Sequence, residues 1–65
     1  MMEQLILALK LHAKGHIEKH KVNVIVLLQK GAGIAEHPDV VETIEKELAI
    51  ISKYDDQLEM IKKYF

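Results

Sequence analysis

Apolar residues recur three and four positions apart along two long stretches of this chain, residues 2–30 and 38–64. This spacing places side chains on one face of an α-helix. In the first stretch the apolar face comprises Met2, Leu5, Ile6, Leu9, Ala13, Ile17, Val24 and Leu27. In the second stretch it comprises Val40, Ile44, Leu48, Ile51, Tyr54, Leu58, Ile61 and Phe65. The pattern predicts an all-α chain made of two amphipathic helices.

A short connection over residues 31–37 separates the two stretches. Gly31 stands where a glycine ends a helix, and Pro38 suits the first position of the next one. Both rods would be about 40 Å long, so we expect them to pair end to end. The chain is therefore predicted to be one domain, residues 1–65, folded as an antiparallel two-helix hairpin. The glycines follow a helix and lack the Lys-Ser/Thr of a phosphate-binding loop, which favours a simple turn.

Two features compete with this interpretation of the first helix. Gly15 costs about 1 kcal/mol relative to alanine within a helix, and marks either a close crossing or a break. Val22–Leu28 is rich in β-branched residues and favours a strand. A single strand would need a sheet partner from another copy, so we prefer the helix.

A hairpin of 65 residues is too small to enclose a core with two rods. The chain has no cysteine, so disulfides cannot compensate, and oligomerisation is the usual remedy. Leu7, Leu11, Val22 and Ile25 lie on the helix face opposite the first apolar face. We expect these four to form an interface in a two-fold homodimer, a four-helix bundle, with a helix of a partner protein as the other possible occupant.

Three histidines, His12, His16 and His20, follow one another every four residues. In a hairpin that bends near Ile34, His12 and His16 lie across from residues 52–56, where Asp55 is the acid on the apolar face. Two histidines one turn apart can bind zinc, which makes His12, His16, His20 and Asp55 a candidate metal set. The favoured alternative is a buried or half-buried polar layer that fixes register and partner number. A further version of this layer would respond to pH near 6. No cofactor is expected.

Lysine supplies all nine basic residues. Lys10, Lys14 and Lys21 share the outer side of the first helix and are candidates for phosphate contacts. A net charge of −1, the absence of arginine and the lack of exposed aromatic residues argue against nucleic-acid binding.

Residues 1–30 have five lysines against two glutamates, and residues 31–65 have four lysines against eight acids. This asymmetry modestly favours pairing of the two helices.

No catalytic constellation, membrane-length apolar run or basic secretory leader stands out in the sequence. We therefore expect a non-catalytic cytoplasmic protein that assembles with itself or with a partner helix and does not engage membranes. A nucleic-acid-binding regulator is the second hypothesis, and a histidine-based metal-binding bundle is the third.

Overall fold

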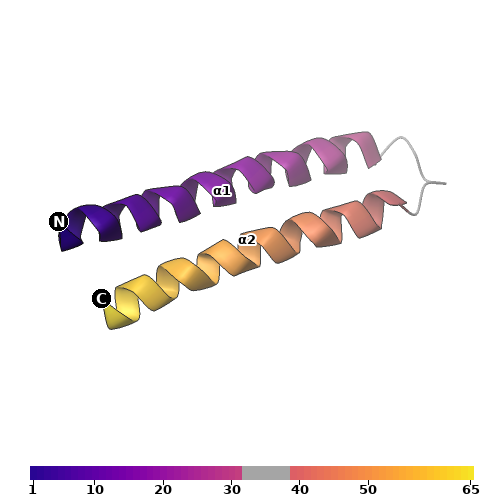
Figure 1. Ribbon diagram of the computed structural model, residues 1–65. Helices are drawn as coiled ribbons and strands as arrows, with labels where there is room; N and C mark the ends of the chain where they lie inside the picture. Colours follow the sequence, from indigo (N-terminus) through magenta and orange to yellow (C-terminus); the bar gives the residue numbers. More distant parts are fainter. Residues whose placement is uncertain (32–38) are drawn as a thin grey trace.

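Two antiparallel helices form the fold of this chain (Figure 1), whose computed structural model describes residues 1–31 and 39–65. Helix α1 spans Met2–Gly31 and helix α2 spans Asp39–Tyr64. Both termini lie at the same end of the hairpin. The predicted all-α hairpin is confirmed. Most of the predicted turn, together with Pro38, lies outside the described residues.

Each helix carries charges that suit its dipole. Acidic residues occupy the first turns, and lysines occupy the last turns, where they complement the partial charges of the helix ends. In α2 the Thr43 hydroxyl also donates a hydrogen bond of 2.7 Å to the Asp39 carbonyl oxygen. Helix α1 continues through Gly15 without a break and includes Val22–Leu28. The strand considered for that segment is therefore wrong.

The side chains that the helices turn toward each other are spaced alternately four and three residues apart. This heptad spacing is typical of coiled coils, in which two helices keep one line of contact along their length. We call these positions the inner line. All are buried or half-buried: Ile6, Lys10, Ala13, Ile17, His20, Val24 and Leu27 in α1, with Val40, Ile44, Glu47, Ile51, Tyr54, Leu58 and Ile61 in α2.

The contact between His20 and Glu47 identifies the register in which the two helices pair. Counting outward from this pair places Ala13 across from Tyr54. Ala13 is completely buried, which follows because a small side chain leaves room for the tyrosine ring. Leu58, the most buried residue of α2, lies one turn further along the same line.

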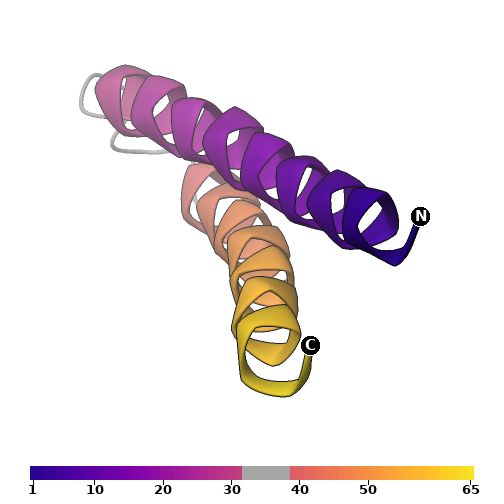
Figure 2. The ribbon, with the colours of Figure 1, turned by 90° about the vertical axis from the view of Figure 1, so that its left-hand side faces the viewer.

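The helices lie further apart at the end that carries the termini, and their axes are inclined to one another (Figure 2). Met2, Leu5 and Leu9 are exposed there, as is Phe65 at the end of α2, although all four were expected in the core. Leu48 is also exposed, because it projects to the side of α2 rather than onto α1. These core assignments are corrected.

The hairpin measures 51 × 15 × 12 Å, so it is a rod only two helices wide. In the part of the chain that the structure describes, neither helix is apolar over a stretch long enough to cross a membrane. One consequence of the rod shape is that every residue lies near the surface. Over residues 1–31 and 39–65, the helices share a line of contact in which only Ala13 and Leu58 are buried, rather than an enclosed core.

Candidate functional site

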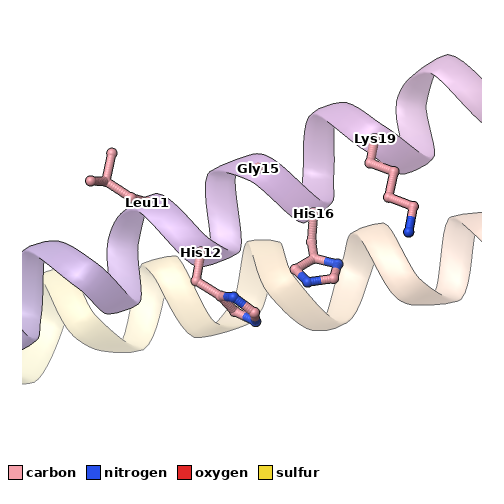
Figure 3. Close-up of a pocket in the computed structure, with 5 residues that line it drawn as sticks. All are labelled: Leu11, His12, Gly15, His16 and Lys19. Atoms are coloured by element: carbon pink, nitrogen blue, oxygen red, sulfur yellow. The ribbon is translucent and has the colours of Figure 1, made fainter.

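A cluster of aromatic rings occupies the middle of the hairpin. His16 of α1 stacks on Tyr54 of α2, with ring centroids 4.5 Å apart and planes inclined by 10°. His12 meets the His16 ring edge-on at 4.4 Å, and His20 lies parallel to it at 6.0 Å. His12 also contacts the edge of Tyr54. We call these four residues the histidine cluster; Figure 3 shows His12 and His16 pointing toward α2.

Glu47 joins the histidine cluster to a neighbouring amide. One carboxylate oxygen lies against Nδ1 of His20, and the other accepts a hydrogen bond of 3.2 Å from Nδ2 of Asn23. The bond with His20 is the main reason that the pKa of Glu47 lies below its ordinary value, and burial opposes that shift. His20, Asn23 and Glu47 form a polar layer across the inner line, and all three are half-buried.

His16 is held differently. Its Nδ1 is buried and has no hydrogen-bond partner among the described residues. Burial is the largest cause that lowers the pKa of His16, and positive charge on His12, Lys19, His20 and Lys53 lowers it further. The ring therefore resists protonation and packs on Tyr54 as a neutral aromatic group.

The position of the histidines across from α2 was predicted correctly, but the acidic residue expected near them was not. His12 and His16 do lie across from the segment 52–56, where they meet Tyr54. Asp55, however, is exposed, and Glu47 is the carboxylate that meets a histidine. Glu47 was missed because only apolar residues were used to trace the α2 face. The four-and-three spacing through Val40, Ile44 and Ile51 would have included it.

The candidate metal set is not drawn together in this structure. Within residues 1–31 and 39–65, no group of three or more histidine or acidic side chains is placed to hold a metal ion. His20 is engaged by Glu47, and His16 is stacked on Tyr54. Metal binding by His12, His16, His20 and Asp55 remains a prediction without a cluster of ligands to support it.

The four residues expected at an oligomer interface are all exposed on α1. Leu7, Leu11, Val22 and Ile25 are each between 51% and 58% exposed. Leu11, Val22 and Ile25 lie on the side of α1 that α2 does not cover, whereas Leu7, the neighbour of Ile6, lies closer to the inner line. More than half of the surface of each of these four residues is therefore open to solvent in the hairpin.

The lysines considered for nucleic-acid contacts do not form a uniform exposed row. Lys10 occupies the inner line and is half-buried, and Lys21 forms an ion pair of 3.2 Å with Glu18. Lys14 is exposed. Phosphate binding by these three lysines therefore remains a prediction that the geometry does little to favour.

No protein-family model, curated protein or solved structure matches this sequence.

Proposed function

We propose that this chain is a non-catalytic, self-assembling helical protein of the cytoplasm, which acts as an oligomerisation or protein-interaction module. Its simplest assembly is a homodimer of two hairpins, four helices in total. Leu7, Leu11, Val22 and Ile25 form the contact between the two copies in this proposal.

The main support for the proposal is the solvent-accessible surface area of the hairpin. A compact single chain of 7.5 kDa exposes about 4200 Å² by the size scaling of monomeric proteins, whereas this hairpin exposes 5269 Å². The excess is about 1000 Å², close to the roughly 800 Å² that each partner buries in a standard protein interface. One further copy therefore suffices to cover it.

The distribution of apolar residues supports the same proposal. The exposed apolar side chains of α1 lie on more than one face, because Leu5 and Leu9 add to Leu11 and Val22. A helix that is apolar on several sides is usually covered on several sides. Burial of Leu11 and Val22 would contribute about 1.5–3 kcal/mol for each side chain that becomes fully covered.

A pair of matched variants tests the proposal. We expect Leu11→Glu to weaken dimerisation at least about tenfold, because association would bury an unpaired carboxylate. Val41→Glu is the control: Val41 is 64% exposed but lies on α2, away from the proposed contact. Sedimentation velocity over a concentration series measures both variants.

Circular dichroism of each variant establishes that the hairpin still forms. Equal association of the wild-type chain and Leu11→Glu would contradict the proposed contact. So would a dimer that Val41→Glu dissociates and Leu11→Glu leaves intact.

A further inference from the structure

Helix α1 carries a second line of positions with heptad spacing, on the side away from α2. Its members alternate at intervals of four and three residues, as the inner line does. We call them the outer line, and all eight are exposed: Gln4, Ala8, Leu11, Gly15, Glu18, Val22, Ile25 and Gln29. Only one of the eight is charged.

The kinds of residue along the outer line are arranged almost symmetrically about its centre, which lies between His16 and Ile17. Each end has a glutamine, apolar residues follow inward, and Gly15 and Glu18 flank the centre. A helix face with this arrangement can meet the same face of a second copy across a two-fold axis.

We propose that two copies of this chain pack α1 against α1 in antiparallel orientation, with the two-fold axis beside His16 and Ile17. This inference rests on the proposed self-assembly and specifies its geometry. It produces four helices in a row, with the two α1 helices inside and the two α2 helices outside.

Side-chain size favours this orientation. Antiparallel pairing sets Ala8 against Ile25 of the second copy, and Leu11 against Val22 of the second copy. Each glycine at position 15 then faces Glu18 of the other copy. A small residue opposite a larger one fills space without a cavity, as close packing requires. Parallel pairing would instead set Gly15 against Gly15 and leave a gap.

A hollow beside Gly15 provides space for a side chain of the second copy in this pairing. A pocket on the α1 surface is lined by Leu11, His12, Gly15, His16 and Lys19, and Figure 3 shows Gly15 between the two histidines. A Cβ atom built on Gly15 would meet nothing within 4 Å. The space is therefore available to the Glu18 side chain of a second copy.

Charge favours the same orientation. In the antiparallel pair, each Glu18 lies opposite Gly15 of the other copy, so the two Glu18 carboxylates stand at different levels along the helix axis. Lys21 also pairs with Glu18 within each copy at 3.2 Å. Parallel pairing would bring the two Glu18 carboxylates to the same level, where like charges repel.

Two single-cysteine variants distinguish the orientations. The natural chain has no cysteine, so Leu11→Cys and Val22→Cys each carry one thiol at an exposed position. The variants are mixed in equal amounts and oxidised in a glutathione buffer, and the products are identified by their masses. We expect the mixed 11–22 disulfide to exceed either homodisulfide several-fold, because only facing positions bring two Cα atoms within disulfide range.

The other outcomes are distinct. Dominant 11–11 and 22–22 disulfides would show parallel helices and overturn the inference. A wild-type dimer without preferential 11–22 cross-linking would overturn this geometry but leave self-assembly standing. A wild-type monomer at every concentration would overturn both proposals. Circular dichroism of the reduced variants checks that the hairpin is intact.

Discussion

His16 occupies an environment that is unfavourable to charge. Its Nδ1 is buried without a partner among the described residues, and its pKa is lowered chiefly by burial. The unfolded chain therefore takes up a proton at this position at a higher pH than the folded chain does. By linkage, His16 makes the folded state less stable as the pH falls through the ordinary histidine value of about 6.5.

We expect the melting temperature to fall between pH 8 and pH 5.5, and His16→Phe to flatten that dependence. Phenylalanine keeps a ring against Tyr54 but binds no proton. His12→Phe is the control, because His12 is exposed and most of the slope should remain. Thermal unfolding followed by circular dichroism gives the slopes, and an unchanged slope in His16→Phe would refute this account.

Glu47 adds a second acid-dependent contribution. Its hydrogen bond with His20 holds the pKa below the ordinary 4.5, so the stabilisation is present above that value and is lost at lower pH. The same contact makes Glu47 and His20 dependent on each other. Removing one leaves the other half-buried without its partner.

A double-mutant cycle over His20→Leu and Glu47→Leu tests this dependence. Each single variant should melt several degrees below the wild-type chain, because a polar partner is left unpaired. The double variant should melt at or above the wild-type temperature, as apolar replacements of buried polar pairs often do. Losses that simply add would show that the two side chains do not interact.

The two helices differ in how much of their apolar surface is covered within a single hairpin. Helix α2 has one main apolar face, which α1 covers along most of its length, although Val41, Leu48 and Met60 are exposed on its other sides. Helix α1 has the inner line and the outer line, and α2 covers only the first. Gly15 belongs to the uncovered outer line, where it lacks any neighbour within 4 Å of its Cβ position.

Gly15→Ala should therefore stabilise the chain. Because α1 is continuous at this residue, alanine avoids the backbone entropy cost of glycine, about 1 kcal/mol, or roughly 4–8 °C in melting temperature for a chain of this size. The reverse change, Ala8→Gly, lies on the same exposed line and should destabilise by a similar amount. A lower melting temperature for Gly15→Ala would mean that a side chain at this position is not tolerated.

For the molecule as a whole, periodicity alone predicted the two helices, their antiparallel pairing and the placement of His12 and His16 across from the segment 52–56. Periodicity could not reveal which side chains lose contact where the helices diverge, so Leu5 and Leu9 were assigned to the core. Helix inclination depends on packing along the entire contact, and no local pattern of residues encodes it.

The partner of the histidines was missed for a different reason. A search for apolar faces leaves out polar residues at coiled-coil core positions, so Asp55 was chosen over Glu47. Once the four-and-three spacing is followed strictly, both His20 and Glu47 fall on the inner line. Three members of the outer line, Leu11, Val22 and Ile25, were predicted at an interface. The fourth predicted residue, Leu7, lies beside the line, and the order of the line along α1 became clear only when the side facing α2 was known.

One hairpin exposes more surface than a compact chain of its mass, and we propose that a second copy covers the excess. Sedimentation equilibrium of the unmodified chain over a wide concentration range tests it directly. We expect a mass of twice the 7.5 kDa of one chain at high concentration, with dissociation on dilution and a melting temperature that falls as the chain is diluted. A cooperatively folded monomer whose melting temperature does not change with concentration would contradict it.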